Sequence, residues 1–169
     1  LSLAIGNDRG DVLGVPFIVF LAPGLIAMQI IQQAFSHSSS SFMIGKIQGN
    51  IVDLVYAPLS AGEVTLAVTL ASVTRSVLIA VISLLVFYLF IDLEIKNFIT
   101  LIAFTLLSAF SLGALGIIAG LWAEKFDHMA TVTNFVIIPL SFLSGTFYSI
   151  ERLPEILQAI SKANPFFYM

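Results

Sequence analysis

The chain has 169 residues, of which 59% are hydrophobic and only 10% are charged, and its mean hydropathy is +1.04. A soluble domain of this length has no way to keep so much apolar surface out of water, so the composition places the chain in a lipid bilayer. The net charge of −3 gives no indication of nucleic-acid binding, and the absence of cysteine excludes disulfide frameworks and thiolate metal sites.

Four stretches are apolar enough to be membrane-spanning helices. A hydrocarbon layer of roughly 30 Å needs about 20 helical residues at 1.5 Å each. The alternating pattern typical of outer-membrane strands is missing, so we expect an all-α, multi-pass transmembrane helix bundle forming one domain over residues 1–169. The predicted spans are residues 15–42, 64–90, 98–122 and 131–147, and the polar connections are 7–14, 45–63, 91–97, 123–130 and the return from 148 onward.

The first span carries a polar strip. Gln29, Gln32 and Gln33 recur at helical spacing, and the four serines at 38–41 can bond to carbonyls one turn earlier. Two interpretations are open. The strip is either a face that packs against protein, or a polar lining of a substrate path, since glutamine facing lipid is costly.

The connection after this span contains a short helix. Residues 51–57 form about two turns, with Ile51, Leu54 and Val55 on one exposed side and Asp53 on another, and Pro58 ends them. An apolar face on a short connecting helix predicts a protein partner. The alternative is an ordinary interfacial loop.

The start of the second span has a helix-capping pattern. Ser60 and Glu63 match the capping box, in which the serine oxygen accepts an early amide and the glutamate reaches back. Further along, Arg75 is the charge within this span. Because the span is longer than the bilayer needs, we expect Arg75 within about one turn of the boundary nearest to 45–63, reaching water by snorkelling. The alternative is an anionic partner inside the bundle or on a lipid head group.

The third span has a face of small residues at three- and four-residue spacing, formed by Ala109, Gly113, Gly116 and Gly120. Such a face allows another helix to approach closely. We expect it to pack inside a single bundle, with helix dimerisation as the alternative use.

The fourth span and the segment after it are broken by prolines. Pro139 frees a carbonyl within the span and predicts either a fixed kink or a hinge. Residues 153–163 then read as a short helix with Pro154 at its first position and Asn164 and Pro165 as its stop. This helix is too short and too charged to span, so it should lie in the interface or re-enter shallowly. Its apolar face consists of Ile156, Leu157 and Ile160.

Motifs for catalysis are missing from the sequence. Gly45 and Lys46 lack the preceding glycine and the following hydroxyl of a nucleotide-binding loop. His37 and His128 stand alone, without the second histidine and glutamate of a zinc helix motif. Ser144 and Gly145 do not form a Gly-x-Ser-x-Gly nucleophile elbow. We therefore expect no enzyme activity, cofactor or metal in this chain itself.

The order of motifs in the last third resembles the permease subunits of type-2 ABC exporters. The resemblance extends back through Pro23 and Gly24 and the connection 50–63, so it covers nearly the whole chain. The matching residues are Phe126 and Asp127, Asn134 and Phe135, Pro139, Leu143, Ser144 and Gly145, Phe147, Leu153 and Pro154, and Asn164 and Pro165.

This resemblance implies specific partners. It makes residues 50–63 the cytoplasmic coupling loop that docks in a groove of an ABC ATPase subunit, and the segment after the fourth span an external re-entrant hairpin. The permease would work as a homo- or heterodimer in the bacterial inner membrane, with ATP and Mg bound by the ATPase. The coupling residues would be Asn50, Ile51, Asp53, Leu54, Val55, Ala57, Pro58, Ser60 and Glu63.

The cargo is open within this resemblance, which covers exporters of drugs, lipids and oligo- or polysaccharides. Short external loops favour an amphipathic molecule. We also expect the chain to lack the start of a first span and a last span. Two alternatives remain, a secondary ion-coupled transporter and a membrane anchor without transport. The basic residues do not support the implied orientation. Lys46 and Lys125 lie on the cytoplasmic side, whereas the outer side has Arg9, Lys96, Arg152 and Lys162.

Overall fold

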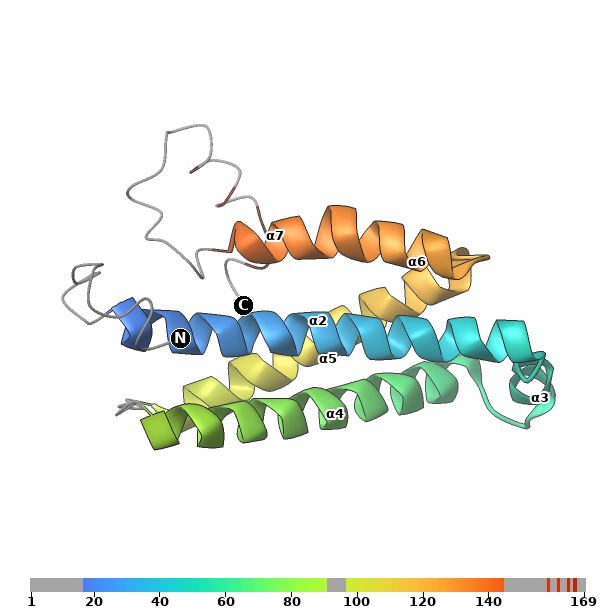
Figure 1. The fold of residues 1–169 in the computed structure, drawn as a ribbon. Coiled ribbons are helices and arrows are strands. Elements are labelled where there is room, and N and C mark those ends of the chain that lie inside the picture. The colour runs from blue at the N-terminus through green and yellow to red at the C-terminus, as the bar shows by residue number, and fades with distance from the viewer. Residues whose placement is uncertain are drawn as a thin grey trace.

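The computed structural model describes residues 17–90 and 97–144, together with Gln158, Ser161, Asn164 and Phe166. All regular structure in the two long segments is helical, which confirms the all-α prediction (Figure 1). The elements are α2 (Phe17–Gln48), α3 (Ile51–Tyr56), α4 (Ala61–Phe90), α5 (Phe98–Trp122), α6 (Phe126–Val132), the π turn η1 (Thr133–Ile137) and α7 (Ile138–Phe142).

Helix α2 is the centre of the bundle. It packs against α5 and α4, and more lightly against α6 and α7. Figure 1 shows α4 on one side of α2, the α6 to α7 segment on the other, and α5 crossing behind. Consecutive long helices run in opposite directions, so α3 and the α5–α6 connection lie at the same end of the bundle. This end is called the α3 end below, and the opposite one the far end.

Among the described residues, three helices are long and apolar enough to cross a membrane, namely α2, α4 and α5. Helix α5 has the predicted bounds of 98–122. Helix α2 continues to Gln48, beyond the expected end at 42, and stops where Gly49 adopts a positive φ of 76°. That left-handed conformation suits glycine and ends a helix. Helix α4 begins at Ala61 and not at 64, because Ser60 is its cap.

The fourth predicted span, 131–147, is wrong at its start. The chain becomes helical already at Phe126 and runs through α6, η1 and α7 to Phe142. Residues 126–130 were expected in a connection, but they form most of α6. The Ile138 N–H donates to the Thr133 carbonyl five residues back, which is the bond of a π turn. Pro139 follows at once and has no N–H of its own, so the proline is accompanied by a wider turn within the helical segment.

The core lies where α2, α4 and α5 meet. Met43 of α2 and Leu112 of α5 are completely buried, and Val73 and Ala80 supply the buried side of α4. The outer sides of α4 and α5 expose rows of large apolar residues such as Leu85. This distribution fits a surface that faces lipid, because lipid carries no penalty for apolar exposure.

The small-residue face of α5 lies against α2 and α4. A Cβ atom added at Gly116 would come within 2.5 Å of the Phe35 carbonyl oxygen, and one at Gly120 within 2.7 Å of the Ser39 carbonyl oxygen. At Gly113 the added atom would fall on the Ser72 hydroxyl. Glycine at 116 and 120 therefore lets α5 pack against the backbone of α2 within one bundle, and glycine at 113 leaves room for a side chain of α4.

Candidate functional site

The α3 end is organised by the junction between α2 and α3. After Gly49 ends α2, Asn50 precedes α3, and its side-chain amide donates to the Gln48 side chain at 3.3 Å and not to its own helix. The Ala57 N–H bonds to the Asp53 carbonyl at 3.0 Å, and Pro58 follows. The short helix is thus held between a left-handed glycine and a proline, which fixes its direction across the end of the bundle.

The start of α4 is closed by the capping box. Glu63 accepts the Ser60 N–H at 2.7 Å and the Ser60 hydroxyl at 2.8 Å, while the Glu63 N–H donates to the Ser60 hydroxyl at 3.3 Å. These reciprocal bonds satisfy amides that have no partner in the first turn of a helix. Ser60 and Glu63 therefore join α3 to α4 through a defined corner.

Of the expected apolar face of α3, Leu54 is 36% exposed and Ile51 is half-buried. Ile51 and Leu54 line a cavity of about 190 Å³ beneath α3, together with Phe42 of α2. Val52 and Tyr56 are more exposed than Leu54, at 50% and 84%. Asp53 is exposed with them, and the side chain of Val55 lies outside the described residues. The spacing of Val52 and Tyr56, four residues apart, is the signal that sequence reasoning missed.

Lys46 connects the end of α2 to the end of α5. Its ammonium donates to the carbonyls of Gly120 and Ala123 at 2.9 Å each, and also to the carbonyl of Leu121. The last carbonyls of a helix lack intrahelical donors and carry the negative end of the helix dipole, so a lysine there satisfies both. The sequence marks Lys46 only as a basic residue near a connection, because its acceptors are backbone atoms 74 to 77 residues away.

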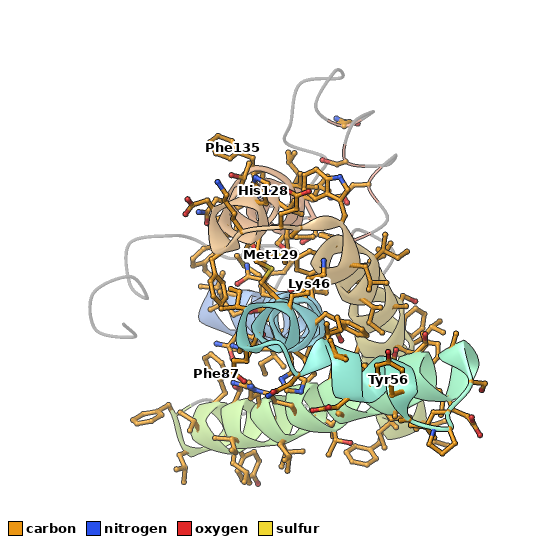
Figure 2. The ribbon with its side chains drawn as sticks, turned by 90° about the vertical axis from the view of Figure 1, so that its right-hand side faces the viewer. Lys46, Tyr56, Phe87, His128, Met129 and Phe135 are labelled. Carbon is orange, nitrogen blue, oxygen red and sulfur yellow. The ribbon has the colours of Figure 1, made fainter. Side chains whose placement is uncertain are left out.

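The corner between α5 and α6 is held by an aromatic contact. The rings of Trp122 and His128 lie with their centroids 5.7 Å apart, and the Glu124 N–H donates to His128 Nδ1 at 3.4 Å. Figure 2 looks onto this end of the bundle, where Lys46, Tyr56 and His128 lie. In the part of the chain that the structure describes, no three His, Cys, Asp or Glu side chains come together as metal ligands do. His128 therefore has a packing role at this corner.

A second group of polar residues lies between α2 and α4. The Ser83 hydroxyl donates to the Gln29 side-chain oxygen at 3.0 Å, and a guanidinium nitrogen of Arg75 lies 3.1 Å from Nδ1 of His37. Gln33 is midway between Gln29 and His37 at helical spacing. We call these five residues the polar seam. On α4 the seam is followed one turn later by Phe87, which Figure 2 shows on the side of α4 that faces α2.

Arg75 lies at the middle of α4. It is the fifteenth of the 30 residues of α4. Ser72, one turn earlier, packs against Gly113 in the middle of α5, whose 25 residues measure about 37 Å. The expected position of Arg75 within about one turn of the membrane boundary stays a prediction. Among the described residues, Arg75 contacts His37 of the neighbouring helix, and the anionic partner of the alternative stays a prediction.

The other polar residues of the first span have separate environments. Ser39 and Ser40 bond back to the carbonyls of Ser36 and His37, as the spacing predicts. The Ser38 hydroxyl and the Gln32 amide nitrogen are buried without a hydrogen-bond partner within the described structure. The predicted polar strip is therefore divided, because Gln29 contacts α4 whereas Gln32 points into the protein.

Part of the return segment contacts α7. The Asn164 side chain donates to the Leu140 carbonyl at 2.6 Å and accepts the Phe166 N–H at 3.0 Å. Ser144 donates through its hydroxyl to the Ser141 carbonyl at 2.6 Å. Leu140 directly follows Pro139, so Asn164 supports the helix beside its π turn. The remaining predicted residues of this hairpin lie outside the described residues: Gly145, Phe147, Leu153, Pro154, Ile156, Leu157, Ile160 and Pro165.

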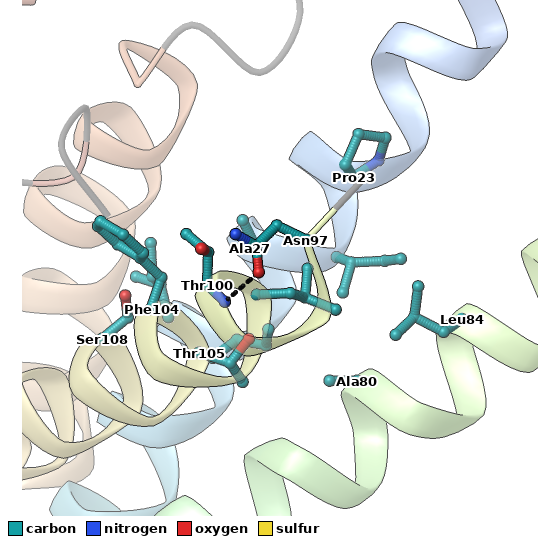
Figure 3. Close-up of a pocket in the computed structure, with 13 residues that line it drawn as sticks. Pro23, Ala27, Ala80, Leu84, Asn97, Thr100, Phe104, Thr105 and Ser108 are labelled. Carbon is teal, nitrogen blue, oxygen red and sulfur yellow. Dashed lines mark hydrogen bonds between the residues drawn. The ribbon is translucent and has the colours of Figure 1, made fainter. Parts of the chain in front are cut away.

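An apolar cavity of about 370 Å³ lies near the far end, between α2, α4 and α5 (Figure 3). Pro23, Leu84 and Phe104 contribute to its apolar walls. At its rim the Asn97 side-chain oxygen accepts the Thr100 N–H at 3.2 Å and so caps α5. Among the described residues, those that line the cavity are apolar or uncharged. The described part of the cavity therefore offers shape and apolar contact.

Comparison with known proteins shows which family the chain resembles. The ABC-2 type transporter family matches residues 4–169. The chain is 31% identical over 165 residues to the inner membrane transport permease YadH of Escherichia coli (strain K12), covering 98% of this chain and 64% of that protein.

More distant relatives have another name. Nodulation protein J of Rhizobium leguminosarum bv. viciae is 27% identical over 172 residues, and that of Sinorhizobium fredii (strain NBRC 101917 / NGR234) is 22% identical over 166 residues. These matches cover 98% of this chain and 64% and 63% of the relatives. The chain thus spans less than two thirds of the length of the curated relatives it matches. No solved structure matches it. Because the family match covers nearly every residue described above, the chain belongs to the ABC-2 type transporter family.

Proposed function

We propose that this chain is the membrane-spanning permease of an ATP-driven exporter in the bacterial inner membrane. A separate ABC ATPase would bind ATP and Mg and dock on α3, and a second permease copy would complete the pathway. The family match and the relative named as an inner membrane transport permease support this role. The cargo would be an amphipathic molecule of the drug, lipid or saccharide type.

One observation carries the proposal more than any other, namely the outward face of α3. A connecting helix with no partner has little reason to expose an apolar pair such as Val52 and Tyr56 beside Asp53. Burying these side chains in a groove would stabilise the complex by about 25 cal/mol for each Å² of apolar surface removed from water. Asp53 would add a charge-assisted hydrogen bond to a basic groove residue.

Movement of α3 would reach the rest of the bundle through short, stiff connections. Gly49 and the Ser60 to Glu63 capping box join α3 directly to α2 and α4. Lys46 joins the same end of α2 to the end of α5. When the ATPase subunits close on ATP, a push on α3 would therefore shift α2, α4 and α5 together, which is the motion that alternating access needs.

Matched pairs of substitutions test the docking face in the complete permease. Tyr56→Ala and Asp53→Lys should each lower co-purification with the ATPase and substrate-stimulated ATP hydrolysis by about tenfold, the effect of losing one well-buried contact or charged hydrogen bond. The controls are Phe98→Ala, an exposed aromatic at the far end, and Asp127→Lys, an exposed acid on α6.

Membrane insertion and thermal stability should stay unchanged in all four variants. The proposal is wrong if Tyr56→Ala and Asp53→Lys retain full assembly and transport. It also fails if the two control variants lose as much as the test variants do. An ion gradient that drives transport without ATP would instead establish the secondary transporter.

A further inference from the structure

The polar seam contains hydrogen-bond donors for which the described chain supplies no acceptor. A guanidinium has five N–H donors and no acceptor, so in the Arg75 to His37 contact Nδ1 of His37 must be the acceptor. The imidazole then carries its proton on Nε2, which becomes a second donor. One arginine N–H is used in this contact, and the others are available. The pair is therefore a cluster of donors.

Arg75 has no counter-charge in the part of the chain that the structure describes. The four carboxylates there all lie at the α3 end, on Asp53, Glu63, Glu124 and Asp127. Arg75 is exposed on the surface of the bundle, at the middle of the apolar helix α4. A positive charge within the hydrocarbon of a bilayer costs several kcal/mol unless an anion or water accompanies it, which is why such residues mark binding sites or ion pathways.

From Arg75 toward the C-terminal end of α4, the surface is first polar, along the seam, and then apolar. Ser83 lies eight residues from Arg75 on α4, about 12 Å along the helix, and bonds to Gln29 on α2. Phe87 follows one turn later. Leu78 and Ile82, one and two turns along α4 from Arg75, are exposed and apolar. A ligand that fits this surface has a polar, acceptor-rich head and a long apolar body.

We propose that Arg75 and His37 bind the anionic head group, a phosphate or a carboxylate, of an amphiphile whose apolar part lies along α4 toward Phe87. Gln29 and Gln33 supply further polar contacts along the seam. This inference rests on the proposed export function when the amphiphile is the cargo, and stands apart from it when the amphiphile is a lipid of the surrounding bilayer. Both sources share the same head-group chemistry.

Binding is measured on the complete permease with its ATPase, in phosphatidylcholine nanodiscs and without nucleotide. Three probes share one alkyl chain and differ in charge: dodecyl phosphate, dodecylphosphocholine and dodecyl maltoside. Wild type should prefer dodecyl phosphate. Arg75→Gln should weaken dodecyl phosphate binding by about tenfold or more, as expected for a lost hydrogen bond to a charged group, and leave the maltoside affinity unchanged.

Further variants separate charge from geometry and from folding. Arg75→Lys keeps the positive charge but lacks the paired N–H donors of the planar guanidinium. It should weaken dodecyl phosphate binding less than Arg75→Gln. His37→Phe should weaken it and His37→Gln, which retains a donor, should recover part of the loss. Thr74→Val is the control, because the Thr74 hydroxyl bonds only within its own helix, to the Leu70 carbonyl at 2.9 Å. If Arg75→Gln does not fold, the lysine and histidine variants carry the test.

Two arms then distinguish the sources. If phosphatidylglycerol in the nanodisc competes with dodecyl phosphate and ATP hydrolysis does not respond, the occupant is a membrane lipid. If dodecyl phosphate stimulates hydrolysis in an Arg75-dependent manner, the occupant is cargo. Equal dodecyl phosphate affinity in wild type and Arg75→Gln overturns the site, as does an equal loss for the maltoside. Loss of ATP coupling with intact selective binding would overturn the export function alone.

Discussion

At the scale of single residues, the side chains that matter most are those that satisfy backbone groups of another helix. Lys46 donates to three carbonyls at the end of α5, and Asn164 donates to the Leu140 carbonyl beside Pro139. Helix ends and proline breaks leave polar backbone groups without partners, and near a membrane few waters are present to replace them. A single long or amide side chain therefore determines whether two helices stay joined at that point.

Removing the ammonium of Lys46 tests this role. Lys46→Met keeps an unbranched, apolar stem but leaves the end of α5 without its donor, so the stability of the complete permease should fall by about 1–3 kcal/mol. Thermal unfolding in detergent measures the change. Lys46→Arg should lose less, because it can still donate to carbonyls. Lys125→Met is the matched control, since Lys125 is an exposed lysine at the same end. An unchanged melting temperature in Lys46→Met would contradict the assigned role.

At the scale of elements, α5 determines how closely the bundle packs. Its glycines lie against the backbone of α2 at Phe35 and Ser39, whereas Gly113 faces a side chain, the hydroxyl of Ser72. Backbone atoms cannot move aside without shifting a whole helix, but a serine hydroxyl can be removed. The three glycines should therefore differ in how they respond to the same substitution.

Alanine scanning of the glycines should reveal this difference. Gly116→Ala and Gly120→Ala should each destabilise the permease by roughly 1–3 kcal/mol through overpacking. Gly113→Ala should be costly alone and partly rescued by Ser72→Ala, while the same second change should not rescue Gly116→Ala. Gly62→Ala is the control, because nothing lies within 4 Å of its added Cβ atom. Thermal unfolding of the six variants decides the question. Equal losses at Gly62 and Gly116 would refute close packing as the reason for glycine.

At the scale of the whole molecule, the α3 end must face one side of the membrane. Among the described residues, Lys46, Lys125 and four carboxylates lie at this end, and Arg75 lies within the bundle. Charge bias by itself does not assign this end to one side of the membrane. Docking of an ATPase on α3 requires it to be cytoplasmic.

The orientation can be measured directly, because the chain has no cysteine. Single cysteines at Tyr56 and at Phe98 place one thiol at each end of the bundle, and both parent side chains are strongly exposed. In intact cells, a membrane-impermeant maleimide should label Phe98→Cys and not Tyr56→Cys. In permeabilised cells, the maleimide should label both variants. Labelling of Tyr56→Cys from outside would invert the orientation and remove α3 from reach of any ATPase.

The sequence by itself determined the features that depend on neighbouring residues. A run of apolar residues predicted both bounds of α5. Ser60 and Glu63 form their capping box within one turn. The order of the motifs identifies the ABC-2 type transporter family. These features need only contacts a few positions apart. They could therefore be read without knowing the arrangement of the helices.

The tertiary structure alone decided which side of each element meets which neighbour. It turned Ile51 toward the bundle and Tyr56 outward, and it placed Arg75 beside a histidine 38 residues away. It also joined Lys46 to carbonyls more than 70 residues away. Periodicity gives the faces of a helix but not their partners, because the partner is set by how all the helices pack together and not by any local pattern.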